Sequence, residues 1–204
     1  MTRLLVNPTV MLTFLFALTI GVIRAQPHDD SAVRALLSQM DACTTRCLAG
    51  IQVGNTTVNE TITRLRASGW IENVRSNSWS WTGAQPDYIQ TPGIGMFDAA
   101  YLENVIEAFY MQTTIPSGDF RLLLGKPKDI YTSVSVAQGK RLLTVLIVYP
   151  PQRYGSYLYI EASAPCPAAF LEVWQAPTFV GLINKEYASQ IAYAASASPP
   201  IRSC

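Results

Sequence analysis

The stretch CTTRCLAGIQVGNTTVNETITRLRASGW, residues 43–70, carries the clearest structural signals of the 204-residue chain. Thr57 is followed three residues later by Glu60, the capping-box pair that satisfies free backbone N–H groups at the start of a helix. Apolar residues then recur at helical spacing, and Ser68-Gly69 is a typical helix end. We therefore predict a helix that begins at Thr57 and ends before Gly69.

The same stretch contains two of the four cysteines, which occupy positions 43, 47, 166 and 204 and allow three disulfide pairings. We predict Cys43–Cys47 with Cys166–Cys204, because the first pair is local and the second would tie the C-terminal tail to the body. The C-x3-C spacing suits neither a thioredoxin-like C-x-x-C site nor a haem site, and structural zinc needs about four N or S ligands. We expect a disulfide-closed entrance to the fold, without metal or cofactor.

The first 25 residues have the layout of a secretory signal peptide. A single early cation, Arg3, precedes an apolar run that ends in small and polar residues near Ala25. We predict cleavage near Ala25 and an extracytoplasmic location (secreted, periplasmic or at the cell surface), where cysteines pair. An uncleaved membrane anchor is the alternative. After the signal peptide, residues 26–42 are expected to form a lead-in to the folded body.

Charge and histidine content narrow the function classes. The formal net charge is +1 and the cations are scattered, whereas nucleic-acid binding needs a clustered basic surface. The one histidine, His28, lies beside the expected cleavage site, so no Ser-His-Asp, Cys-His or His-based zinc site is expected in the body. A small hydrolase that uses carboxylates without histidine remains the catalytic alternative. We name no catalytic residue.

Beyond the entrance, the sequence predicts an α+β fold of two related units, each a helix followed by a three-stranded antiparallel meander. In the first unit, residues 43–113, the strand-like runs are SNSWSWTG, GIGMFDAA and YLENVIEAFYMQTT. In the second, residues 114–165, a short helix in IPSGDFRLLLGKP precedes DIYTSVSVAQ, RLLTVLIVYP and SYLYIEASA. RLLTVLIVY is apolar on both faces, so we expect it to be the most buried strand. Residues 166–204 are predicted to form two short helices, split at Pro177, and an irregular tail.

Two short motifs resemble those of a known family. IQVGNTT at residues 51–57 and LGKP at residues 124–127 are similar to the elements that open and close the helix of BamE/SmpA-OmlA modules, which are small extracytoplasmic proteins. The C-x3-C-x-x-G-I-x-x-G-x-T-T entrance also resembles secreted bacterial proteins. The first unit departs from the pattern, because residues 67–70 read ASGW where L-G-x-P is expected.

A tandem of such units also resembles the architecture of the β-lactamase inhibitory protein, whose concave sheet binds a partner. The resemblance covers residues 43–165 and implies a binding or scaffold module rather than a catalyst. A protein partner in the envelope or medium is expected, and membrane contact only through an uncleaved signal.

The candidate binding residues are two aromatic pairs. Trp79 and Trp81 lie two residues apart, as do Tyr157 and Tyr159, so each pair projects from one face of its strand. Aromatic side chains give a large contact area with few rotatable bonds and are efficient interface anchors. The residues that alternate with the tyrosines are aliphatic and fit a core better, so we place the tyrosines on an exposed sheet face. For the tryptophans, core and interface both remain open.

Overall fold

The computed structural model describes residues 10–18, 29–43, 47–75, 77–91, 93–99, 104–137, 139–151 and 156–197. Residues 1–30 and 31–204 form separate compact units. In the first unit, residues 10–18 are helical. Among the described residues, no helix has the length and apolar character needed to cross a membrane. Most of the predicted signal peptide lies outside the described residues, so its cleavage stays a prediction.

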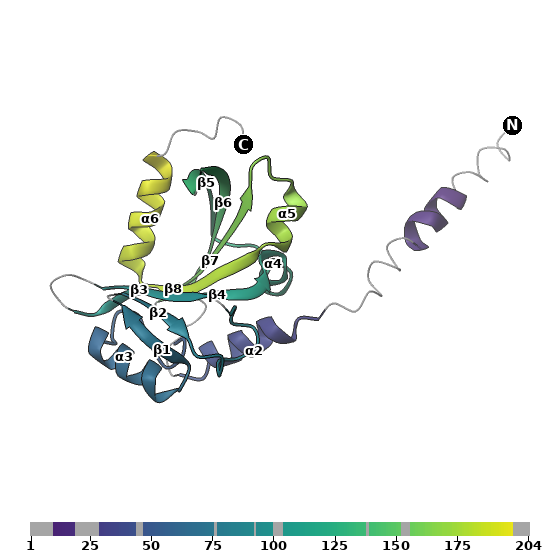
Figure 1. The fold of residues 1–204 in the computed structure, drawn as a ribbon. Coiled ribbons are helices and arrows are strands. Elements are labelled where there is room, and N and C mark those ends of the chain that lie inside the picture. Colours follow the sequence, from purple (N-terminus) through teal and green to yellow (C-terminus); the bar gives the residue numbers. More distant parts are fainter. Residues whose placement is uncertain are drawn as a thin grey trace, which may run out of the picture. The chain divides into compact units, whose positions relative to one another are not determined.

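The second unit is built on one eight-stranded sheet (Figure 1). In chain order the strands are β1 (Ile71–Arg75), β2 (Ser78–Trp81), β3 (Ile94–Ala99), β4 (Ile106–Pro116), β5 (Asp129–Ala137), β6 (Lys140–Tyr149), β7 (Tyr157–Pro165) and β8 (Pro177–Ile183). The order across the sheet is β1-β2-β3-β4-β8-β7-β6-β5, and every pair of neighbours is antiparallel. The helices of this unit are α2 (Ser31–Met40), α3 (Val58–Ala67), α4 (Ser117–Leu124), α5 (Phe170–Gln175) and α6 (Lys185–Ala197).

The predicted fold class, two α+β units that each hold a helix and a three-stranded meander, is wrong. β8 pairs with β4 on one side and with β7 on the other, and it joins both halves of the chain into a single sheet. The first half also has four strands, because residues 71–75 form β1 rather than a loop.

The C-terminal segment contains two helices, α5 and α6, as expected, but the residues between them form the strand β8 instead of a simple break at Pro177. PTFVGLI is rich in aromatic and β-branched residues, which favour a strand. Because β8 is central and buried on both faces, its apolar run shows no alternation, and such a run cannot be distinguished from a buried helix by its period.

The local predictions around the entrance are confirmed. Thr57 and Glu60 form the expected capping box, and Ser68 is the C-cap of α3, which ends at Ala67. Cys43 and Cys47 are joined by a disulfide with their Cα atoms 5.9 Å apart. Cys166 is also disulfide-bonded, whereas Cys204, its predicted partner, lies outside the described residues.

The main core lies between one face of the sheet and helices α2, α3 and α4. Leu36 of α2, Leu65 of α3 and Phe120 of α4 are fully or almost fully buried in it. The expectation that β6 is the most buried strand is wrong, since only residues 147–149 of β6 are buried, whereas β4 and β8 are buried over most of their length. The reason is position: β6 lies next to the edge strand β5, and β4 and β8 lie at the centre of the sheet.

Candidate functional site

The face of the sheet opposite the main core, here called the outer face, carries a row of paired residues from four strands. Met96, Tyr110, Gly181 and Tyr159 are direct cross-strand neighbours on β3, β4, β8 and β7. Because side chains alternate along a strand, residues two positions away share this face. These include Asp98 on β3, Glu161 on β7 and Phe179 on β8.

The helix α6 covers part of the outer face. Its residues Tyr187, Ala188 and Ile191 pack on a small hydrophobic cluster that contains Ala108 and Ile183. Asn184 precedes the helix, and its side-chain oxygen accepts a hydrogen bond of 2.7 Å from the Tyr187 backbone N–H. This local bond caps the first turn of α6 and thereby fixes where the Tyr187 ring leaves the helix.

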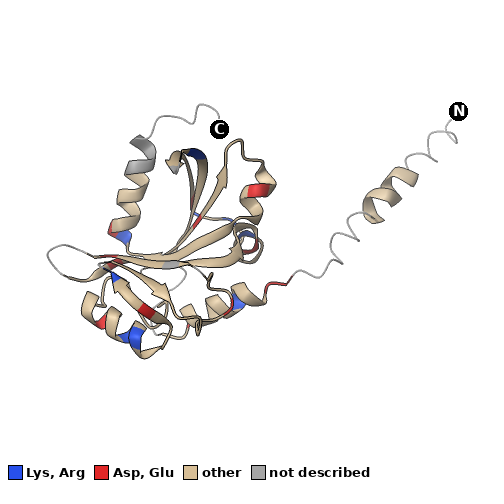
Figure 2. Cartoon of the chain, viewed as in Figure 1, with Lys and Arg blue, Asp and Glu red and all other residues tan. Residues whose placement is uncertain are grey.

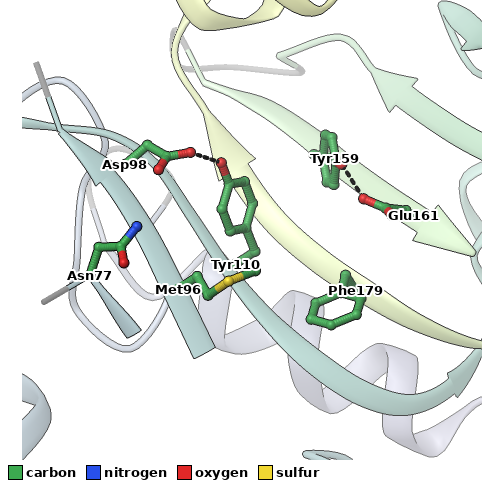
Figure 3. Close-up of a pocket in the computed structure, with 7 residues that line it drawn as sticks. All are labelled: Asn77, Met96, Asp98, Tyr110, Tyr159, Glu161 and Phe179. Atoms are coloured by element: carbon green, nitrogen blue, oxygen red, sulfur yellow. Dashed lines mark hydrogen bonds between the residues drawn. The ribbon is translucent and has the colours of Figure 1, made fainter. Parts of the chain in front are cut away.

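A pocket of about 250 Å³ opens on the outer face beside this cluster (Figure 3). Aromatic, sulfur and carboxylate groups from different strands converge on it, as the close-up shows. The lining residues are Asn77, Met96, Asp98, Tyr110, Tyr159, Glu161 and Phe179. We call this feature the tyrosine–carboxylate pocket.

Hydrogen bonds hold both carboxylates of the pocket against tyrosine hydroxyls. The hydroxyls of Tyr110 and Tyr187 lie 2.5 and 2.6 Å from Asp98 Oδ2 and 2.8 Å from each other. Each of the two hydroxyls has one proton to donate, and these two protons serve three close oxygen–oxygen contacts. The hydroxyl of Tyr159 donates to Glu161 Oε2 in the same way (Figure 3). Each of these tyrosine rings is thereby held in place by the hydrogen bond between its hydroxyl and a carboxylate.

Gly181 makes room for the tyrosine pair. The ring centroids of Tyr110 and Tyr159 are 5.6 Å apart, with the rings tilted by 48°. A Cβ on Gly181 would lie 2.9 Å from Tyr110 Cδ1 and closer still to the carbonyl oxygen of Phe109. Since the carbonyl belongs to the backbone of the paired strand, a side chain here requires either β4 or the Tyr110 ring to move.

The environment of the pocket is apolar and acidic. Burial raises the pKa of Tyr110 far above its ordinary value, and the hydrogen bond to Asp98 raises it further. Burial, followed by the Glu161 charge, does the same to the pKa of Tyr159. For Tyr187, burial and the hydrogen bond to Asp98 raise the pKa to about 12. All three hydroxyls therefore keep their protons at neutral pH.

Charged residues are few and dispersed over the described part of the chain (Figure 2). The described residues that line the tyrosine–carboxylate pocket include two carboxylates and no lysine, arginine or histidine. At the margin of the same face, Lys128 Nζ lies 5.0 Å from the centroid of the Tyr157 ring. Among the described residues that line this pocket, the negative charge of the carboxylates is therefore not balanced by a cation.

The structure separates the two predicted aromatic pairs. Tyr157 and Tyr159 lie on the outer face, opposite the main core, and alternate with fully buried aliphatic residues. Both are half-buried there rather than exposed. Trp79 and Trp81 lie in the main core, 2% and 6% exposed, so they cannot serve as exposed anchors. Trp79 is paired with Gly95, where a Cβ would collide with its indole ring, and this glycine lets the ring pack into the core.

The tryptophans also pack closely with other core rings. The ring centroid of Trp79 lies 5.1 Å from that of Phe109 and 6.0 Å from that of Phe97, both in stacked geometry, and Trp81 meets Trp79 edge-on at 5.7 Å. These contacts explain why the pair faces the core: the aromatic rings of neighbouring strands lie on that side.

Of the residues that line the pocket, only Tyr159 was predicted from the sequence. The missed lining residues are Asn77, Met96, Asp98, Tyr110, Glu161 and Phe179, and Tyr187, which contacts Asp98, was missed as well. Asp98 and Glu161 interrupt apolar strands as isolated acids, a signal that marks their faces as different from the core. The contact between Tyr110 and Tyr187 spans 77 positions and had no local signal.

Comparisons with protein-family models, with curated proteins and with solved structures found no match for this chain. The resemblance to BamE/SmpA-OmlA modules therefore stays a prediction. The function is argued below from the tyrosine–carboxylate pocket.

Proposed function

We propose that this protein is an extracytoplasmic binding module that engages a partner protein through the outer face of its sheet. The tyrosine–carboxylate pocket is the anchor of that interface. The observation that carries the proposal is the convergence of Tyr110, Tyr159 and Phe179 with two carboxylates in one partly exposed hollow. Tyrosine is among the residues that supply the most binding energy in protein interfaces.

The rigidity of the site also supports binding. Its side chains come from neighbouring strands of one sheet, and the tyrosines are held by carboxylates before any ligand arrives. A site that is already ordered loses less conformational entropy when a partner binds. The Cys43–Cys47 disulfide supports the extracytoplasmic part of the proposal, because such bonds persist in oxidising compartments.

A second candidate is the hydrolase that uses carboxylates without histidine. One observation favours it: Asp98 and Glu161 line the same pocket, and pairs of carboxylates catalyse reactions such as glycoside hydrolysis. The two candidates differ in a measurable way. A hydrolase would lose turnover in both Asp98→Asn and Glu161→Gln while still binding substrate, whereas a binding module has no turnover to lose.

Site-specific photocrosslinking in cells that naturally make the protein tests the proposal. A benzophenone amino acid replaces Phe179, which lines the pocket, or Val136, which is 72% exposed on the edge strand β5. We expect the Phe179 position to give a discrete protein adduct and the Val136 position to give none. Equal adducts at both positions, or none at Phe179, would count against the proposal.

A further inference from the structure

We infer that the tyrosine–carboxylate pocket receives a cationic side chain, the ammonium of a lysine or the guanidinium of an arginine, from the partner protein. This inference rests on the proposed function and names the group that anchors the interface. Three properties of the pocket support it: its charge, its aromatic walls and its size.

The charge of the lining selects a cation. Asp98 and Glu161 are the carboxylates of the pocket, and none of the described residues that line it is basic. The tyrosine hydroxyls bond to Oδ2 of Asp98 and Oε2 of Glu161, so the second oxygen of each carboxylate is left to accept from a ligand. An anionic group would meet repulsion here, whereas an N–H-bearing cation finds a carboxylate acceptor at either side of the pocket, Asp98 on β3 or Glu161 on β7.

The aromatic walls favour the same group. A cation placed within about 6 Å of an aromatic ring centroid is attracted by the negative face of the ring. The tilted rings of Tyr110 and Tyr159, with Phe179 beside them, form such a wall. The outer face already holds one contact of this kind, because Lys128 Nζ lies over Tyr157 at 5.0 Å. An ammonium group is therefore compatible with this surface.

The size of the pocket suits one side chain. Its volume of about 250 Å³ lies below the ~300–1,000 Å³ that is typical of pockets for whole small molecules. The end of a lysine or arginine side chain needs less space than a cofactor or a folded metabolite. A partner that inserts one basic side chain would place its charge beside a carboxylate and the tyrosine rings, while the rest of the interface lies on the surrounding face.

The test uses the whole protein and small probes of defined charge, followed by NMR of the tyrosine ring signals. The cationic probes are Nα-acetyl-lysine and Nα-acetyl-arginine N-methylamides, and the neutral isosteres are the corresponding norleucine and citrulline amides. We expect saturable shifts with the cations and none with the isosteres. Glu161→Gln should weaken binding by about ten-fold, the loss of one charge-assisted hydrogen bond, and the matched control Glu72→Gln on β1 should not.

The outcomes separate this inference from the proposed function. Equal binding of neutral isosteres, or no binding of any probe at millimolar concentration, overturns the cationic ligand. Tighter binding of free butylammonium than of the lysine amide also overturns it, because the source would then be a small amine rather than a side chain. In each case a Phe179 crosslink would leave the proposed function standing, and its absence would remove that function independently.

Discussion

Replacing Gly181 by alanine tests whether the tyrosine pair depends on a missing side chain. The added Cβ would lie 2.9 Å from Tyr110 Cδ1 and still closer to the Phe109 carbonyl oxygen, so β4 or the ring must shift. Overpacking of this kind costs about 1–3 kcal/mol in the free energy of unfolding. With a urea m-value of ~2 kcal/mol/M, the unfolding midpoint should fall by about 1 M.

Tryptophan fluorescence is a suitable probe for this measurement, because Trp79 and Trp81 lie in the main core on the other face of the sheet and report global unfolding. Gly139→Ala is the control. Gly139 has a φ of +74° and open space around its Cβ position, so that substitution adds backbone strain without a clash. Only Gly181→Ala should also shift the NMR signals of Tyr110 and Tyr159. An unchanged midpoint with unchanged tyrosine signals would refute the packing argument.

Three further predictions concern the same face. Tyr110→Phe and Tyr187→Phe should each cost about 1 kcal/mol in urea unfolding, and the double variant more than their sum, because Asp98 then loses both donors; strict additivity would contradict the shared-acceptor geometry. The pKa of Tyr187 is raised to about 12 from its ordinary value near 10, so its stabilising contribution is complete below pH ~10 and is lost as pH rises toward 12. Urea midpoints measured across that window should fall less in Tyr187→Phe than in the unmodified chain, and parallel curves would exclude a role for this hydroxyl. Tyr159→Ala should cost less stability than Trp79→Ala, for which about 3–5 kcal/mol is expected from the loss of a core ring; thermal unfolding compares them, and an equal loss would place Tyr159 in the core.

Local features of the fold were predictable and non-local ones were not. The capping box at Thr57 and Glu60 works through contacts three residues apart, so the start of α3 can be read from the four residues TVNE. The position of β8 depends on its pairing with β4 and β7, and these pairings cannot be read from the residues of β8 alone. A central strand has two buried faces, and its sequence then lacks the alternation that marks a strand.

Alternation predicted that paired aromatics share a face, but it could not say which face is the core. For Tyr157 and Tyr159 the aliphatic neighbours settled the matter correctly. For Trp79 the neighbours are serines, and the deciding feature is Gly95 on the next strand, which leaves space for the indole ring. The burial of the tryptophans therefore required the strand register.

The missed strand and the missed site have one physical cause. Residues 177–187 supply the strand that joins the two halves of the sheet, the glycine between Tyr110 and Tyr159, and the Tyr187 hydroxyl at Asp98. When this segment is taken as helical, Tyr110 and Tyr159 belong to separate units and have no reason to meet. Once β8 lies between β4 and β7, Gly181 brings the two rings to 5.6 Å, and Asn184 turns the chain into α6. The pocket is a consequence of where one strand pairs, and its chemistry follows from the residues that this pairing brings together.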